Sequence, residues 1–476
     1  MSSLTVEKSL LYPDIQDIIK NPEEKYVASF IMEMKLHTEE KDLDRRDGVI
    51  LNSINIIRDY TENISDYIEI QLSMHLGTYV YDVYKQLHNI EVTLITYRQM
   101  YQGKKPFISK ERYKAVYLIE KNTAIPTVIN QSKDDLNQNL PITITLQLVD
   151  RSVETIRVKT TQGNFDKKIN PKNTDMSPKA FMKSIFSEEC DKILIENKPA
   201  IDLISIEEPD NKDELKAITL SSYTRIIEIP EYLQNENIGV YNAGIGCYIQ
   251  KFGLDHYTYK KILFIYSLFD PKKYDDAEYK MIFYVPVASN LSMLDNTYKY
   301  KDKTLKMLPY TMSKINDQKE TNVMSTGSGF RSSNAASYMK KPVEITEEGP
   351  VFNRNRLNTE VIYKDRKDNL NYAPNRAVVG NQFAIASQIV EKVGNYVTLE
   401  VSNIDHDFIY PGACKINYED DENKIKEVKG VIHRASITYR ASSMNLPMDY
   451  NSDITAFTSH ATLQVFIMQK EDYPTN

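Results

Sequence analysis

The sequence predicts an α+β chain with a small strand-rich unit near each end and a mixed α+β middle. Alternation of apolar and polar residues with a period of two, typical of half-buried strands, is concentrated near residues 26–100 and after residue 394. Between these regions, strand patterns and helical stripes are mixed. With 476 residues, the chain is also too long for one ordinary domain.

The first unit is predicted over residues 24–103, after an N-terminal arm at 1–23. One clear strand is ISDYIEIQLSMHLG, whose core face would consist of Ile68, Ile70, Leu72 and Met74. The segment TYVYDVYKQLHN instead has apolar residues at i, i+3, i+4 and i+7, counted from Val80, which is one stripe of a helix. Strands with one short helix indicate a small barrel or sandwich with a helix packed on it.

The middle, residues 104–295, is predicted to form one or more mixed peripheral domains. In SPKAFMKSIFSEECDKIL, Ser177 is a plausible N-cap with Pro178 at the first helical position. The segment SVETIRVKTTQGNFDKK is predicted to be a hairpin arm with its turn at 162–164. KKILFIYSLF and YKMIFYVPVA are predicted to be buried strands, and EYLQNENIGVYNAGIGCYIQKFG to be helical in part.

A polar stretch separates the middle from the last unit. Residues 313–342 are short of large apolar side chains, which indicates a long loop, and we assign 296–345 as a linker that could contribute to the last unit. The last unit, 346–476, is predicted to begin with a helix capped by Asn375 and ended by Gly394. Antiparallel strands follow, ending with ITAFTSHATLQVFIMQ.

Charge and cysteine content limit the class of protein. The chain has 59 basic and 66 acidic residues, a net charge of -7, so it lacks a global basic footprint for gripping nucleic acid. Its three cysteines are far apart and lack C-x-x-C spacing, which argues against a disulfide framework or a thiolate zinc site. Without a signal-peptide pattern or an apolar run long enough to span a membrane, we expect a soluble protein of a reducing compartment, with no membrane anchor.

The chain contains 33 tyrosines and no tryptophan. Tyrosine suits surfaces that become half-buried against a partner. It also favours strands, so a sheet-rich fold explains the same composition. Both interpretations stay open.

The stretch NIDHDFIYPGACKINYEDDENKIKEVKGVIHRASITYR, residues 403–440, holds most of the candidate chemistry. His406 lies between Asp405 and Asp407, but neighbours on a strand point to opposite faces, so we expect a corner histidine beside solvated carboxylates and no metal site there. YEDDENKIKEVKG is predicted to be a charged hairpin tip, and His433 a structural histidine without an orienting carboxylate. The TGSGF loop lacks the Lys-Ser/Thr of a phosphate-binding loop. We therefore expect no catalytic residue, metal or cofactor.

The order of elements in this stretch resembles the last tube domain of the baseplate central hub protein of contractile-tail, T-even-type bacteriophages. Pro411 and Gly412 match the Pro-Gly of the family before a strand, and Val431, Ile432 and His433 match its Val-Ile-His. The likeness is good over about 40 residues and diffuse elsewhere; GVILNSINIIRD followed by DYIEIQLSM is similar to the first tube domain.

The resemblance implies a structural virion protein of the tail baseplate, assembled in the host cytoplasm, and not an enzyme. Family members form homotrimers in which each chain contributes two tube-type antiparallel β-barrel domains with packed helices. The resulting ring joins a sixfold tail tube or tube-initiator ring to a threefold central spike, which often carries a lysozyme. DNA passes transiently through its lumen. A candidate ring-docking tip is Glu419, Asp420, Asp421 and Glu422, with a solvated turn as the equal alternative.

Two other classes of function stay open. A sixfold tube-initiator would have one tube domain per chain, and a type VI secretion-like spike hub would be a closely related assembly. A peptidoglycan hydrolase would need a carboxylate pair in a cleft, and none of the acids here lies in a recognisable motif.

Overall fold

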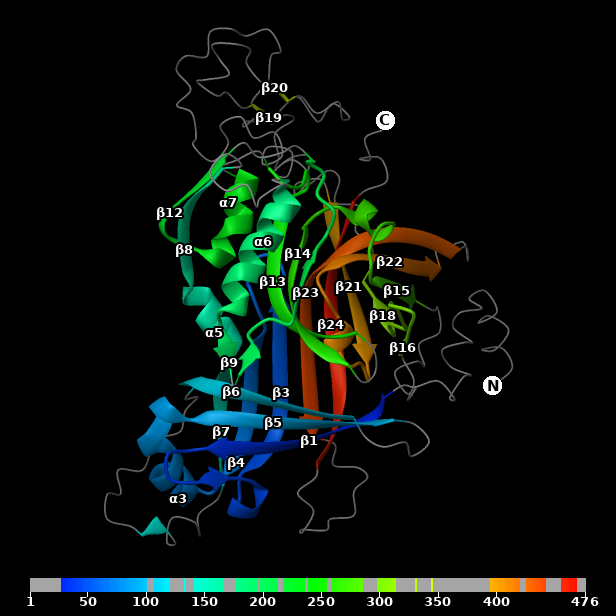
Figure 1. The fold of residues 1–476 in the computed structure, drawn as a ribbon. Coiled ribbons are helices and arrows are strands. Elements are labelled where there is room, and N and C mark those ends of the chain that lie inside the picture. Colours follow the sequence, from blue (N-terminus) through cyan, green and yellow to red (C-terminus); the bar gives the residue numbers. More distant parts are fainter. Residues whose placement is uncertain are drawn as a thin grey trace, which may run out of the picture.

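The computed structural model describes residues 27–100, 107–119, 132–133, 141–166, 177–195, 197–212, 217–235, 239–254, 258–285, 298–313, 330–331, 344–345, 394–419, 425–441 and 455–468. Strands dominate this part of the chain, as the alternating patterns predict (Figure 1). Among the described residues, no helix combines the length and apolar character needed to span a membrane.

The N-terminal strands form a closed ring of antiparallel pairings, here called the N-terminal ring. The order β3–β4–β7–β6–β5–β1–β24–β23 returns to β3. The strands are β1 (Val27–His37), β3 (Ile50–Asp59), β4 (Tyr67–Met74), β5 (Glu91–Met100), β6 (Phe107–Ile119), β7 (Ile142–Asp150), β23 (Ile425–Ala441) and β24 (Thr455–Met468). A short β2 (Asp42–Leu43) pairs with β1, followed by the 3-10 turn η2 (Arg45–Asp47). The ring includes β6 and β7, although we expected residues after 103 to lie in a peripheral domain.

The two C-terminal strands of the ring continue into a second assembly, here called the C-terminal sheet (Figure 1). The first part of β23 pairs with β22 (Gly412–Glu419), and its later part, 434–440, pairs with β3. In β24, residues 455–457 pair with β1, whereas 460–468 pair with β21 (Gly394–Ser402). The sheet is completed by β15 (Lys280–Val285), β16 (Tyr298–Lys301), β17 (Thr304–Met307) and β18 (Thr311–Met312). Both assemblies therefore share two long strands and cannot move independently at that seam.

A helical lobe packs beside the two assemblies. It contains α5 (Arg151–Val158), α6 (Pro178–Asp191), α7 (Ile229–Asn235), the turn η6 (Ile226–Glu228) and a ribbon of β8 (Thr160–Asp166) and β12 (Ala217–Arg225). A three-stranded sheet of β11 (Leu203–Ile206), β13 (Ile245–Gly253) and β14 (Tyr259–Ser267) joins this lobe to the main core. Ile249 and Leu263 face the lobe, while Tyr248 and Phe252 face the main core. The remaining short elements are β9 (Leu194–Ile195), β10 (Lys198–Pro199), η7 (Pro271–Tyr274), β19 (Phe330–Arg331) and β20 (Glu344–Ile345).

The predicted core face of β4 is confirmed. Ile70, Leu72 and Met74 are fully buried and Ile68 is nearly so, all within the main core. The predicted helical stripe near residue 80 is also helical, as α3 (Leu76–Thr78), η3 (Tyr79–Val83) and η4 (Tyr84–Asn89) in succession. Ser177 caps α6 as predicted: its side chain accepts a hydrogen bond from the Ala180 amide, and Pro178 is at the first helical position.

The predicted hairpin at 152–168 is wrong. The residues SVETIRV belong to α5, because Asp150 caps the helix by accepting hydrogen bonds from the Ser152 and Val153 amides. Val153 and Ile156, three positions apart, then face the lobe core. Residues 162–164 are not a turn; they lie inside β8. The predicted helix after Asn375 and most of the loop at 313–342 lie outside the described residues.

Candidate functional site

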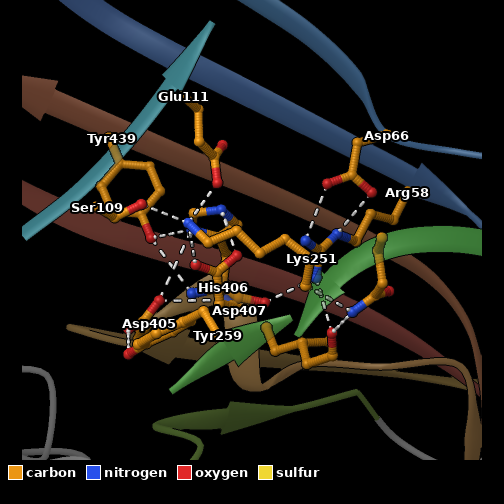
Figure 2. Close-up of polar contacts among 12 residues, drawn as sticks. Arg58, Asp66, Ser109, Glu111, Lys251, Tyr259, Asp405, His406, Asp407 and Tyr439 are labelled. Carbon is orange, nitrogen blue, oxygen red and sulfur yellow. Dashed lines mark hydrogen bonds and ion pairs between the residues drawn. The ribbon is translucent and has the colours of Figure 1, made fainter. Parts of the chain in front are cut away.

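A buried network of charged side chains lies where the N-terminal ring, the three-stranded sheet and the β21–β22 connection meet (Figure 2). Its basic members, Arg58 on β3, Arg98 on β5 and Lys251 on β13, come from strands far apart in sequence. Its acidic members include Asp405 and Asp407, both fully buried, so the expectation of solvated carboxylates beside His406 is wrong. A buried ion remains stable only with matched partners, so these contacts fix how the elements meet.

The turn that carries the acids corrects the sequence prediction. Residues 405–407 are not a strand: Asp405 caps the 3-10 turn η10 (His406–Phe408) through a hydrogen bond from the Asp407 amide. Ligand atoms of Asp405, His406 and Asp407 consequently lie within 4.8 Å of one another. The reason given for excluding a metal is therefore wrong, because it assumed alternating strand faces. The carboxylates are instead engaged by cationic side chains of the protein.

Arg98 is the main partner of this turn. Its Nε donates to Asp405 Oδ2 at 2.5 Å, and its Nη2 donates to Asp407 Oδ2 at 2.6 Å. The guanidinium also lies over the Tyr259 ring, 4.5 Å from the centroid, and the Tyr259 hydroxyl donates to Asp405 Oδ2. Arg98 therefore joins β5 of the ring to the β21–β22 connection through charge-assisted bonds in a water-poor environment.

Arg58 makes a second link from the ring to the same connection. Its Nε and Nη2 bond both oxygens of Asp66 at 3.0 and 2.9 Å. Its Nη1 donates to the carbonyl oxygens of His406 and Ile409, each at 2.7 Å. The Tyr248 hydroxyl from β13 donates to Asp66 as well. Arg58 thus bonds groups from two parts of the fold, and Tyr248 adds β13 through Asp66.

Lys251 brings the three-stranded sheet into the network. Its ammonium group lies 2.5 Å from Glu111 and 3.2 Å from Asp407, and it donates to the Ser109 hydroxyl at 2.6 Å. Burial alone would lower the pKa of Lys251, but Asp407 and Glu111 raise it above its usual value. Lys251 therefore stays charged at neutral pH and ties β13 to β6.

Burial and neighbouring charges shift the pKa of Asp407, in the turn η10, in opposite directions. Burial alone would raise the pKa of Asp407, but His406, Lys251 and Arg98 together hold it well below its usual value. The pKa of His406 is lowered, chiefly by burial. Its Nδ1 lies 2.6 Å from the Tyr439 hydroxyl, and its Nε2 lies 3.1 Å from Asp407 Oδ1.

A small pocket adjoins the network, with a volume of about 50 Å³. Pockets for drug-sized ligands usually measure about 300–1,000 Å³, so this one fits an ion or a few waters and not a sugar chain. The three cysteines offer no activated thiol, since burial raises the pKa of Cys190 to about 11 and of Cys247 to about 12, and that of Cys414 further. The arrangement is suited to holding the assemblies together.

The residues that carry the resemblance to phage hub proteins have structural roles. Gly412 begins β22 with φ of 151°, and a Cβ there would lie 3.0 Å from the Tyr410 ring. His433 is buried; its Nε2 lies 2.6 Å from the Leu268 carbonyl oxygen and its Nδ1 3.1 Å from the Tyr396 hydroxyl. Burial lowers the pKa of His433 to about 4. Pro411 is buried beside Gly412.

The strand faces around His433 depart from simple alternation. The pairing of β23 with β24 shifts between Ile432 and Arg434, so His433 is an extra, bulged residue. Beyond it, Ala435 and Ile437 join the main core on the same side as Ile432. The bulge thereby keeps one face of β23 apolar through both assemblies.

Most of the candidate ring-docking tip lies outside the described residues. Glu419 ends β22 and pairs with Ile425, but Asp420, Asp421 and Glu422 lie outside the described residues. The contacts of this tip stay a prediction.

The exposed side of the shared strands forms a second candidate surface, here called the polar face. One row crosses from β21 to β7 through paired residues: Ser402, His460, Thr438, Asn55, Glu69 and Gln147. The next row consists of Thr458, Arg440, Ser53, Gln71 and Thr145. All are half-buried or exposed. Short uncharged side chains therefore prevail on this face of a chain in which 26% of residues are charged.

Sequence reasoning missed the basic half of the network, although a signal for two of its members was present. In β3, Arg58 follows Ile54 and Ile56 at every second position, so alternation places it on the core face. In β5, Arg98 follows Val92 and Leu94 in the same way. A charged residue at a core position of a strand indicates a buried partner.

Comparisons with known proteins give structural neighbours only. No protein-family model matches the chain, and a search of curated proteins gives no significant match. Among solved structures, the 43 kDa tail protein of prophage MuSo2 from Shewanella oneidensis aligns with 93% of this chain and 99% of its own, at 11% identity and a TM-score of 0.42.

Two further neighbours are chains of a PdpA–VgrG complex, one without its lid and one, from Francisella, half-lidded. They align with 91% and 98% of this chain, at 10% and 7% identity and TM-scores of 0.39 and 0.32. This chain spans about 64% and 62% of their lengths. Since every TM-score lies below 0.5, no function is assigned from these alignments.

Proposed function

We propose that the chain is a structural subunit of a contractile-tail baseplate: a trimeric hub that joins a sixfold tail tube to a threefold spike. The observation that carries this proposal is the pairing of two β assemblies in one chain through the shared strands β23 and β24. The resemblance of residues 403–440 to the last tube domain of phage hub proteins supports it.

Symmetry gives the physical reason for two assemblies in one chain. A closed ring of three chains presents six units when each chain supplies two. The units must keep a fixed relative position to match a sixfold partner. The continuous strands supply that rigidity, and the buried Arg98 and Arg58 contacts add cross-links between the ring and the β21–β22 connection.

The polar face suits the lumen of such a ring. DNA that slides through a channel should meet few cations, because each lysine or arginine that neutralises a phosphate adds salt-dependent affinity. On the two rows of the face, the charged residues are one acid, Glu69, and one base, Arg440. The charges on these rows therefore cancel, and most of the other side chains there are short and neutral. Under this proposal the polar face lines the channel.

Thiol labelling tests the location of the polar face. Thr438→Cys places a thiol at its centre; native Cys190 and Cys414 are buried and Cys247 is half-buried, so labelling is measured relative to the wild type. In the assembled ring, a small maleimide should label this thiol and a bulky polyethylene-glycol maleimide should label it slowly. Tyr223→Cys, at a side chain 86% exposed on the β12 ribbon, should react with both reagents. Equal labelling of Thr438→Cys by both would place the polar face on the outside.

The rival functions predict different results. A tube-initiator would assemble as six copies, not three. A peptidoglycan hydrolase would clear a suspension of purified peptidoglycan, whereas a structural hub would leave its turbidity unchanged.

A further inference from the structure

Beside the small pocket, the carboxylates outnumber the arginine and lysine side chains by one, with His406 not counted. Its carboxylates are Asp66, Glu111, Asp150, Asp405 and Asp407, and its fixed cations are Arg58, Arg98, Lys251 and Lys261. Four of the acids each have a principal cation of their own: Arg58 for Asp66, Lys251 for Glu111, Lys261 for Asp150 and Arg98 for Asp405. The fifth, Asp407, shares Arg98 and Lys251 with two of them.

The uncompensated negative charge can be assigned to one atom, Asp407 Oδ1. Both cations reach Asp407 through Oδ2, at 2.6 and 3.2 Å. Asp407 Oδ1 is buried and accepts no hydrogen bond from the described residues; the nearest polar group is His406 Nε2 at 3.1 Å. The Asp407 side chain is 1% exposed, so bulk water does not compensate. A buried carboxylate oxygen without a donor is costly.

The pocket provides room for a compensating ion beside Asp407. Its lining includes Asp407, Asp66, Glu111 and Asp150, together with Lys251, Lys261 and His406. Its volume of about 50 Å³ exceeds the roughly 10–15 Å³ that one water needs. Hard cations prefer oxygen ligands such as carboxylates, which this lining supplies.

We propose that this pocket binds one small monovalent cation, of the size of sodium or potassium, against Asp407 Oδ1. A single charge completes the balance of five carboxylates against four cations, whereas a divalent ion would overshoot it beside Lys251 and Lys261. The bound ion would link η10, β13 and the ring strands β4, β6 and β7, all of which contribute to the lining. This inference is independent of the proposed assembly.

Melting at constant ionic strength tests the proposal on the full-length protein. We expect the melting temperature in sodium or potassium chloride to exceed that in choline chloride by about 2 °C or more, because choline is too large to enter. Asp407→Asn removes the surplus charge and should abolish the difference. Asp275→Asn, which changes an exposed carboxylate paired with Lys429, should retain it.

A direct binding measurement covers the case in which Asp407→Asn fails to fold. Sodium-23 resonance broadening by the wild-type protein should be reversed by potassium and not by choline. Equal melting in sodium and choline without sodium broadening would overturn the proposal. It would also be overturned if the cation effect persisted in Asp407→Asn, or if only pH changed the stability, since the charge would then come from a proton on His406.

Discussion

Replacing Arg98 should markedly lower the free energy of unfolding of the whole fold. The side chain is 1% exposed and bonds both Asp405 and Asp407, which are fully buried. In Arg98→Met the two carboxylates keep the Tyr259 hydroxyl, the Asp407 amide, Lys251 and His406 as close partners. Breaking a buried pair by removing one partner costs about 3–5 kcal/mol, so a loss of that size is expected.

A double variant separates the charge effect from the loss of packing. Replacing the charges together, as in Arg98→Met with Asp405→Asn, should recover a substantial part of the loss, because one stranded carboxylate is then neutral. Urea unfolding followed by circular dichroism measures both variants, since the chain has no tryptophan for fluorescence. A loss below about 1 kcal/mol in Arg98→Met, or a double variant no better than the single one, would refute the role given to this network.

Three further variants test other parts of the structure. Ile70→Asp places an unpaired charge in the main core and should yield insoluble protein, so a soluble, cooperatively folded variant would contradict the assigned face of β4. Gly430→Ala should lower the unfolding midpoint, because its Cβ would lie 2.5 Å from Val465 Cγ1 and 2.7 Å from the Phe466 carbonyl oxygen; an unchanged midpoint would argue against this close strand contact. Burial raises the pKa of Glu207 to about 7 from 4.5, so its contribution is full below pH 4.5 and is lost as the pH rises through 7. Glu207→Gln stays neutral and should gain roughly 1–3 kcal/mol over the wild type between pH 5 and 8, whereas a gain independent of pH would exclude this titration.

Local patterns in the sequence predict most strands and the helix α6 well. The alternation around Ile70 sets its face, and Ser177 with Pro178 marks a helix start, because both signals depend on neighbours in sequence. The hairpin prediction at 152–168 failed because α5 has only eight residues, too few for a helical stripe to stand out from alternation.

The shared strands and the charge network depend on contacts distant in sequence. The alternation of apolar and polar residues in β23 does not reveal that its later half pairs with β3. In that pairing, Asp59 of β3 bonds Arg434, 375 positions away in the sequence. The sequence around η10 does not distinguish a turn from a strand, and its apolar residues Ile404, Phe408 and Ile409 are buried as strand residues would be. Its acids converge only once Arg98 and Lys251 are brought beside them by the fold.

The mass of the isolated, full-length protein under native conditions tests the central proposal most directly. A hub that supplies two β assemblies per chain predicts a complex of three chains, each of 55.1 kDa, that appears as a ring in electron micrographs. A stable complex of six chains would indicate a tube-initiator. A species that remains a single chain at all concentrations tested would contradict the proposed hub.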